Sequence, residues 1–301
     1  MKKCIFCNCT KNDSEFNDEH IVLKALGGFG EKNMYHHVCK KCNSSFGASI
    51  DSLASDTLII FRYLLKIRGR NGVPNPFPRE CFYPLELSEE QGKITNVKGR
   101  LITNQNGDIV RFQAIPKAYD SLVVSEKQYF HGFVKHFLKR TGQKTFQDDN
   151  NLKSKLIIKK YPYIILPLLT TEQLDYMCLS CIPLAIKMAF EFFCKISDVY
   201  QKDELFEPIK DFIINFNVKE VITIPTNVYS RALYDTMSKE DWAEWKALPN
   251  HDIRISLESD IDKNKVIAKI DLYHFFTFEI IMSENASQYN NLNESLCISI
   301  Q

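Results

Sequence analysis

Apolar and polar residues alternate with different periods along the chain, and these periods predict where helices and strands form. An apolar segment that starts at His20 is followed by residues 27–30, which hold three glycines. This order is typical of a short strand that ends in a turn. From Asn43 as far as Leu58, apolar residues recur at helical spacing. The spacing predicts one helix, in which Asp51 lies about two turns beyond Asn43.

The remaining sequence carries patterns for both helices and strands. Ser238 is placed to cap a short helix that runs to Trp245. A β-hairpin is predicted over residues 93–113, helices over 126–140, 178–196 and 204–216, and antiparallel strands over 220–225, 252–257 and 265–282. The mixture predicts an α+β fold. The helix over 178–196 holds a further CxxC pair, and its apolar surroundings favour buried thiols over redox chemistry.

A break near residue 70 divides the chain. Residues 69–78 contain two glycines and three prolines, which interrupt regular structure. We therefore expect an N-terminal domain over residues 1–70 and a larger mixed α+β domain over residues 71–301.

Composition narrows the class of protein. Of 301 residues, 45% are apolar, which is enough for a large buried core. We expect no membrane span, because such a span requires an apolar run of roughly 18 residues. Lys2 and Lys3 are not followed by the apolar segment of a signal peptide. We expect a cytoplasmic protein with no membrane partner, in which the ten cysteines are thiols or metal ligands rather than disulfides.

Charge is unevenly distributed, although the net charge is only +1. Residues 1–170 carry 26 lysines and arginines against 16 aspartates and glutamates, whereas residues 171–301 carry 12 against 21. A basic half suits a polyanionic partner. The alternative is an ordinary solvated surface whose charges are unevenly spread.

Two CxxC pairs lie within the first 42 residues, and together they offer four thiolates to one ion. Tetrahedral sulfur coordination selects Zn²⁺, and four protein ligands leave no open position for a substrate. Cys9 fits no second pair at this spacing. The sequence therefore predicts a structural zinc site made by Cys4, Cys7, Cys39 and Cys42.

The predicted zinc site would bring together side chains that suit phosphodiester hydrolysis. Glu19 and His20 lie between the two pairs, and Asn43 and Asp51 follow the second. A hard ion such as Mg²⁺ takes oxygen ligands from one or two such side chains. A neutral imidazole can deprotonate an attacking water. His36 and His37 lie on an expected strand just before the second pair. One of them could contact a zinc thiolate or a phosphate. An ordinary strand position for both is equally consistent with the sequence.

The order CxxC, Glu-His, Leu-Gly-Gly, CxxC-Asn and Asp51 resembles the HNH endonuclease family in its zinc-stapled ββα-metal form, over about the first 60 residues. The resemblance implies an N-terminal ββα-metal domain with a treble-clef-like zinc site. It implies that His20 is the general base and that Mg²⁺ or Mn²⁺ binds Glu19, Asn43 and Asp51. Asn43 would either ligate the ion or fix the loop that carries His20.

Two positions depart from the family pattern. Leu23 stands where many members have proline, which affects strand geometry. Asp51 stands at the closing histidine position, and a carboxylate is the better ligand for Mg²⁺.

The function that the resemblance implies is metal-dependent cleavage of DNA, in bacterial defence against phage or in a mobile element. Residues 71–301 would then recognise the target or regulate the nuclease, with an activating ligand or a partner protein. Cleavage of both strands by a single site would need a homodimer or two visits. DNA phosphates are expected to contact Arg62, Lys66, Arg68, Arg70, Lys159 and Lys160. The alternative is a zinc-stapled nucleic-acid-binding module that does not cut.

Overall fold

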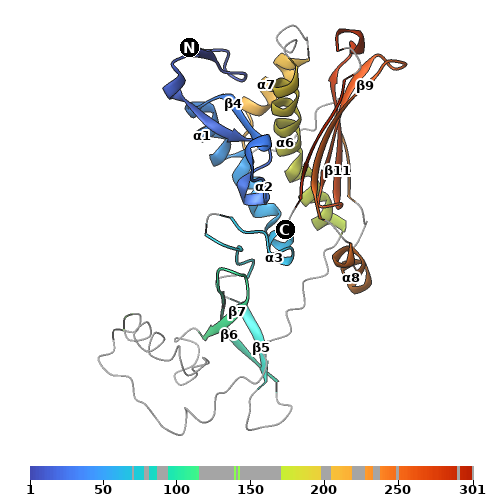
Figure 1. Cartoon of the computed structure of the whole chain (residues 1–301). Helices are drawn as coiled ribbons and strands as arrows, with labels where there is room; N and C mark the ends of the chain where they lie inside the picture. The colour runs from blue at the N-terminus through green and yellow to red at the C-terminus, as the bar shows by residue number, and fades with distance from the viewer. Residues whose placement is uncertain are drawn as a thin grey trace. The chain divides into compact units, whose positions relative to one another are not determined.

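The computed structural model describes residues 1–69, 71–77, 81–86, 94–114, 139, 142, 171–197, 205–218, 228–232, 238–248, 251–289 and 292–299. The chain divides into two compact units (Figure 1). One unit joins residues 1–70 with residues 167–301, and the other consists of residues 71–166. The sequence analysis placed a boundary near residue 70 but assigned all of residues 71–301 to one domain. In the structure residues 167–301 pack with the N-terminal segment instead.

The N-terminal segment has two antiparallel strands followed by helices, as expected for a ββα fold. A hairpin of two short strands precedes them. The strands are β1 (Lys2–Lys3) and β2 (Thr10–Lys11), each of two residues. Strand β3 (Phe16–His20) pairs with β4 (Met34–Cys39), and the register is shifted between Asn17 and Glu19. Three helices follow: α1 (Lys40–Ala48), α2 (Ile50–Thr57) and α3 (Ile59–Leu64).

Two details of this segment differ from the sequence prediction. Strand β3 ends at His20, whereas the sequence predicted a strand that begins there. Most residues of β3 are polar, so hydrophobic alternation does not reveal this strand, although it pairs with β4. The single helix predicted from Asn43 is broken at Ser49, whose φ of −120° and ψ of −87° are not helical. Its hydroxyl group donates to the Ser45 carbonyl at 2.9 Å, and such a local bond competes with the helix. Asn43 and Asp51 therefore lie on different helices.

A long central helix, α6 (Thr171–Ile196), joins the N-terminal segment to the C-terminal sheet. It packs against α2 on one side and against strands of the sheet on the other (Figure 1). The sheet is antiparallel with the order β12-β9-β10-β11-β8. Its strands are β8 (Val228–Ala232), β9 (Ile253–Asp260), β10 (Lys265–Leu272), β11 (Phe276–Ser283) and β12 (Asn293–Ile298).

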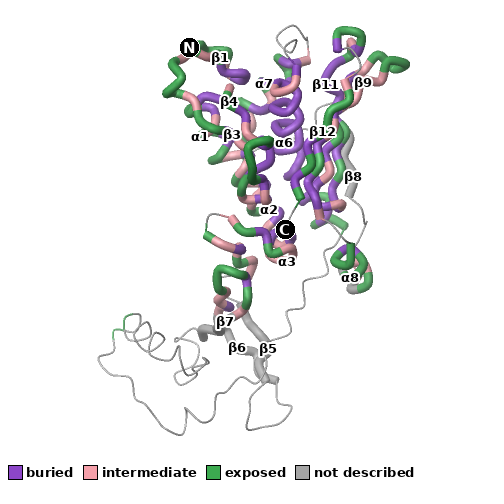
Figure 2. Tube along the Cα trace, in the orientation of Figure 1, coloured by how far each residue is buried: buried purple, intermediate pink, exposed green. Residues whose placement is uncertain are grey.

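Helix α6 is long and apolar enough, by length and composition alone, to cross a membrane, which the sequence analysis did not expect. In the structure 94% of its most apolar window is buried inside the protein. Figure 2 shows α6 as buried along most of its length. A helix that is apolar on all sides and covered by protein is a core helix. Its two CxxC cysteines, Cys178 and Cys181, are free thiols and buried, as expected.

Aromatic side chains connect the N-terminal segment to the rest of this unit. Phe6 contacts Phe46 of α1 and Phe190 of α6, with ring centroids 4.6 and 5.4 Å apart. Phe61 of α3 contacts Trp245 in an edge-on arrangement, with centroids 5.2 Å apart. All these rings are fully or nearly fully buried. The first 70 residues therefore share one hydrophobic core with α6 and the sheet, rather than having a separate one.

Two further helices of this unit agree with the sequence prediction. Helix α7 (Phe206–Ile214) lies within the predicted range. Helix α8 (Lys239–Ala247) begins after Ser238, whose hydroxyl group accepts from the Asp241 N–H at 3.1 Å. The Asp241 carboxylate accepts from the Ser238 N–H in return, so the predicted N-cap is a complete capping box.

The second unit contains a three-stranded antiparallel sheet with the order β5-β6-β7. Its strands are β5 (Cys81–Glu86), β6 (Ile94–Thr103) and β7 (Ile109–Ala114). The pairing of β6 with β7 confirms the predicted hairpin. Asn104 holds its turn, because its side-chain oxygen accepts from the N–H groups of Asn106 and Asp108. The helix predicted over residues 126–140 and the strand over 220–225 fall outside the described residues.

Candidate metal centre and catalytic site

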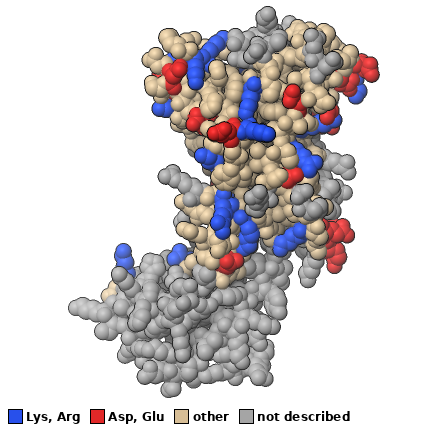
Figure 3. Space-filling model, viewed as in Figure 1, with Lys and Arg blue, Asp and Glu red and all other residues tan. Residues whose placement is uncertain are grey.

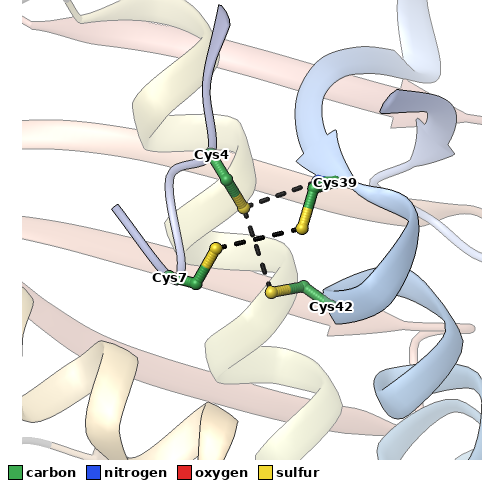
Figure 4. Close-up of side chains that lie close together, drawn as sticks. All are labelled: Cys4, Cys7, Cys39 and Cys42. Carbon is green, nitrogen blue, oxygen red and sulfur yellow. Dashed lines mark hydrogen bonds between the residues drawn. The ribbon is translucent and has the colours of Figure 1, made fainter. Parts of the chain in front are cut away.

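Four cysteines from three parts of the N-terminal segment meet at one point (Figure 4). Two follow β1, one ends β4, and one lies in the first turn of α1. Their sulfur atoms all lie within 4.8 Å of one another. The sulfur pairs Cys4–Cys42 and Cys7–Cys39 are each 3.9 Å apart. Sulfur ligands around one tetrahedral ion have such separations. The four residues are Cys4, Cys7, Cys39 and Cys42.

The surroundings favour the thiolate, the form that binds metal, at Cys4, whereas burial raises the pKa of Cys7 to about 11 and the hydrogen bond with Cys4 raises that of Cys42. The Cys39 N–H donates to the Cys4 sulfur at 3.4 Å, and Lys11 Nζ donates to the Cys39 sulfur at 3.5 Å. Hydrogen bonding to Cys42 lowers the pKa of Cys4 to about 4. Cys9 is exposed and lies outside the cluster. The donor set fits Zn²⁺, and four protein ligands make the site structural.

Asn33 fixes the loop that follows His20. Its side-chain oxygen accepts from the Val22 N–H at 2.8 Å, and its amide nitrogen donates to the carbonyl groups of Val22 and Gly28 at 2.7 and 3.0 Å. Asn33 is completely buried. Fixing the loop that carries His20 is one of the two roles predicted for Asn43, and Asn33 makes these hydrogen bonds to the residues that follow His20.

Gly28 is required by this tight packing. A β-carbon built at Gly28 would lie 1.8 Å from the Val22 carbonyl oxygen and 2.8 Å from the Asn33 amide nitrogen. No side chain fits into this space, so the Leu-Gly-Gly sequence reflects a close backbone approach. The signal that could have identified Asn33 is its position just before β4, opposite this turn.

His20 stands at the end of β3 and is half-buried. Its register partner on β4 is Met34. Burial lowers the pKa of the imidazole below its usual value, and the nearby charge of Lys24 lowers it further. A neutral imidazole at physiological pH can accept a proton, so His20 is in the state that a general base needs.

Glu19 and Asp51 converge on one cation, which is the ammonium group of Lys187. The distance from Lys187 Nζ is 2.6 Å to Glu19 Oε1 and 3.4 Å to Asp51 Oδ1. A third carboxylate, that of Glu191 one turn further along α6, lies 3.5 Å away. Lys187 and Glu191 have no exposed side-chain surface, and the Glu19 side chain is 5% exposed. Sequence analysis missed Lys187, which lies 168 positions from Glu19.

The cluster contains three acidic side chains and one basic side chain. Burial by itself would lower the pKa of Lys187, but the charges of Glu191, Asp51 and Glu19 raise it, so the ammonium group stays protonated. Burial raises the pKa of Glu191 well above its ordinary value, and burial also raises that of Glu19. Asp51 Oδ1 and both carboxylate oxygens of Glu191 have no hydrogen-bond partner among the described residues. The carboxyl groups of the cluster can therefore accept more hydrogen bonds than one ammonium group donates to them.

The other residues that the sequence singled out, Asn43, His36 and His37, lie elsewhere in the N-terminal segment. Asn43 is half-buried on α1, and no hydrogen bond joins it to the Lys187 cluster within the described part of the chain. His36 is exposed on β4 and pairs with Asp18 at 2.8 Å, and His37 is half-buried next to it. Of the alternatives that the sequence leaves open for them, a hydrogen bond to a zinc thiolate is not seen at His36, whose partner is a carboxylate.

The predicted DNA contacts divide into three groups. Arg62 is 9% exposed, and its guanidinium group donates to the Ser55 carbonyl at 3.1 Å, so it supports helix packing and is not a surface contact. Lys66 and Arg68 are exposed. Arg70, Lys159 and Lys160 lie outside the described residues.

Comparison with known protein families identifies the N-terminal segment. Residues 4–59 match the family described as HNH endonuclease. The matched range begins at the first cysteine of the cluster, ends just after α2, and includes Glu19, His20 and Asp51. Neither the curated proteins nor the solved structures compared with the chain include a match. The segment over residues 4–59 is thus an HNH endonuclease segment with a four-cysteine cluster.

The first prediction concerns the cysteine cluster. We expect about one zinc ion per chain in elemental analysis of the purified protein. Cys42→Ser should lose this zinc and destabilise the N-terminal segment, because the coordinated ion ties residues 4–7 to β4 and α1 and so contributes folding free energy. Cys9→Ser is the matched control and should keep both zinc and fold. A Cys42→Ser variant with full zinc content would contradict the assignment.

The second prediction concerns Asn33. Asn33→Ala removes three buried hydrogen bonds, each of which contributes about 1 kcal/mol. We expect the free energy of unfolding to fall by about 2–4 kcal/mol in urea denaturation. Asn43→Ala should change it by less than about 0.5 kcal/mol, as is usual for a substitution that breaks no buried contact. Equal effects of the two variants would show that Asn33 does not anchor the loop.

Proposed function

We propose that this chain, whose residues 4–59 belong to the HNH endonuclease family, is a metal-dependent endonuclease that hydrolyses DNA phosphodiester bonds. One observation carries the proposal: two carboxylates, Glu19 and Asp51, converge on a single cation position, and the charge of the lysine at that position contributes to lowering the pKa of the half-buried His20. The family match implies nuclease chemistry on DNA. The reaction mechanism and the residues that perform it are proposals.

In this proposal His20 accepts a proton from the water that attacks the phosphorus atom. Its neutral state at physiological pH leaves a nitrogen lone pair free for this proton. Asn33 acts through His20, because its three hydrogen bonds hold the loop that begins directly after the histidine. Fixing this loop holds the imidazole in one place relative to the phosphate, which is the positional requirement of general-base catalysis.

Glu19 and Asp51 are the residues that would hold a catalytic Mg²⁺ or Mn²⁺. Carboxylate oxygens are the ligands that such hard ions prefer, and both side chains already point at one cation. Asn43, the third ligand proposed from the sequence, would have to approach from α1. When bound, the divalent ion would neutralise charge on the scissile phosphate and on the leaving oxygen.

DNA would approach over the exposed cations of the N-terminal segment. A surface cavity of about 690 Å³ is lined by Lys32, Lys66 and Arg68, by Phe29, and by residues 296–299 after and within β12. Phe29 is 55% exposed, so an aromatic face stands among these cations. Figure 3 shows basic side chains in several groups on the visible face, with acidic side chains beside some of them. Cations with an exposed aromatic ring suit a nucleic-acid backbone and its bases.

One observation favours a second candidate function, a nucleic-acid-binding module that does not cut. The carboxylates that would hold the metal ion are paired with Lys187, and their side chains are only 5% exposed at Glu19 and 17% exposed at Asp51. Incubation of a plasmid with Mg²⁺ or Mn²⁺, compared with the same incubation in EDTA, distinguishes the two functions. Strand breaks that depend on the metal support the nuclease, whereas binding without breaks supports the module.

The third prediction is that His20→Ala loses cleavage by a factor of at least about 10², because removal of a general base costs roughly 10²–10⁴. Zinc content and the thermal unfolding temperature should be unchanged. His36→Ala is the matched control, since His36 is an exposed histidine on the neighbouring strand. Cleavage of a labelled duplex under single-turnover conditions is the measurement. Near-normal cutting by His20→Ala would refute the assigned base.

The fourth prediction concerns the cations of the cavity. The double variant Lys66→Ala/Arg68→Ala should bind all DNA sequences more weakly, because phosphate contacts are independent of sequence. The slope of log affinity against log salt should flatten by about one unit for each phosphate that the variant no longer neutralises. Lys263→Ala/Lys265→Ala, in the acidic part of the chain, is the control and should change neither quantity. Equal effects in both variants would mean that DNA binds elsewhere.

A further inference from the structure

Lys187 occupies the position at which the HNH segment gathers its carboxylates. Its ammonium nitrogen lies 2.6 Å from Glu19, 3.4 Å from Asp51 and 3.5 Å from Glu191, so three donors face three carboxylates. The ring of Phe46 lies 5.8 Å from the same nitrogen and adds a cation–π contact. The side chain has no exposed surface. The central helix α6 thus supplies a cation to the centre of the HNH segment.

This ammonium group and a divalent ion cannot share Glu19 and Asp51. Mg²⁺ requires carboxylate oxygens at about 2.0–2.1 Å, and the ammonium group already contacts the same oxygens. Two cations at such a separation repel strongly inside a protein, where water does not screen them. A divalent ion therefore enters only if Lys187 leaves Glu19 and Asp51.

Glu191 offers Lys187 another partner on the same helix. It lies four positions further along α6, which is the spacing of an intrahelical ion pair. Both of its carboxylate oxygens have no hydrogen-bond partner among the described residues. A small rotation of the lysine side chain toward Glu191 would satisfy them, and it would free Glu19 and Asp51 without moving the helix.

We propose that Lys187 is the resident cation of the HNH centre, that it competes with a divalent metal ion for Glu19 and Asp51, and that Glu191 receives it when the metal ion binds. This inference rests on the proposed function, because it concerns the metal ligands assigned there. It gives the C-terminal part of the chain a direct role: α6 determines whether the metal site is available.

The test is the affinity for Mn²⁺, measured by electron paramagnetic resonance on the full chain with its zinc content verified. In the double variant Lys187→Met/Glu191→Leu, one positive and one negative group are replaced by apolar side chains of similar size. The replacement leaves Glu19 and Asp51 without their cation, which lowers stability, so the fold of the variant is verified before the measurement. We expect this variant to bind Mn²⁺ at least about tenfold more tightly than the wild type. If Lys187 occupies the site more than about 90% of the time in the wild type, the apparent Mn²⁺ affinity there is reduced at least tenfold.

Two controls show where the ion binds. Adding Glu19→Gln to the double variant should abolish the tight Mn²⁺ site. Lys195→Met removes a lysine from the same helix but outside the cluster, and it should leave the wild-type affinity unchanged. Equal Mn²⁺ affinities of the wild type and the folded double variant would overturn the proposal. Because this readout does not use cleavage, a chain that binds Mn²⁺ as expected but cuts no DNA would refute the nuclease function and leave this inference standing.

A milder variant decides the question if the double variant does not fold. Glu191→Gln removes the alternative partner and leaves Lys187 with Glu19 and Asp51 alone. The ammonium group should then remain on these two carboxylates, and Mn²⁺ affinity should fall below that of the wild type. An unchanged or higher affinity of Glu191→Gln would overturn the competition between Lys187 and the metal ion.

Discussion

A buried ammonium group connects the zinc-site segment to the rest of the protein. Lys187 is fully enclosed and contacts Glu19 and Asp51 of the N-terminal segment together with Glu191 of its own helix. Burying a charge is costly unless it is paired. Removing one partner from such a cluster costs about 3–5 kcal/mol in comparable proteins. The four groups therefore depend on one another, and the position of α6 is linked to the geometry of the proposed catalytic carboxylates.

The same contact explains why the HNH segment does not stand as a separate domain. The four-cysteine cluster holds the start of the chain to β4 and α1. Helix α6 packs against α2, with Phe190 against Phe6 and with Lys187 against the carboxylates. Residues 167–301 thus complete the core of residues 1–70. A region that completes the core and also contacts the metal ligands is well placed to control them.

Features that a residue pattern records could be predicted from the sequence, whereas features that depend on single hydrogen bonds or on the fold could not. The four cysteines follow from their spacing, because two CxxC pairs have few other uses. The break at Ser49 and the burial of Arg62 depend on local bonds and packing that hydrophobic spacing does not record. Asn33 was missed because its bonds go to backbone atoms. Lys187 lies in an apolar helix far along the chain, and only the fold brings it to Glu19.

The most direct measurement is anomalous X-ray scattering at the zinc and manganese absorption edges, from crystals of Lys187→Met/Glu191→Leu grown with Mn²⁺. We expect one zinc peak among the four cysteine sulfurs and one manganese peak between Glu19 and Asp51. Those two peaks would place the structural and the catalytic ions in the HNH segment, with the catalytic ion at the position that Lys187 occupies in the wild type. A zinc peak with no manganese at Glu19 and Asp51 would contradict the proposed metal centre.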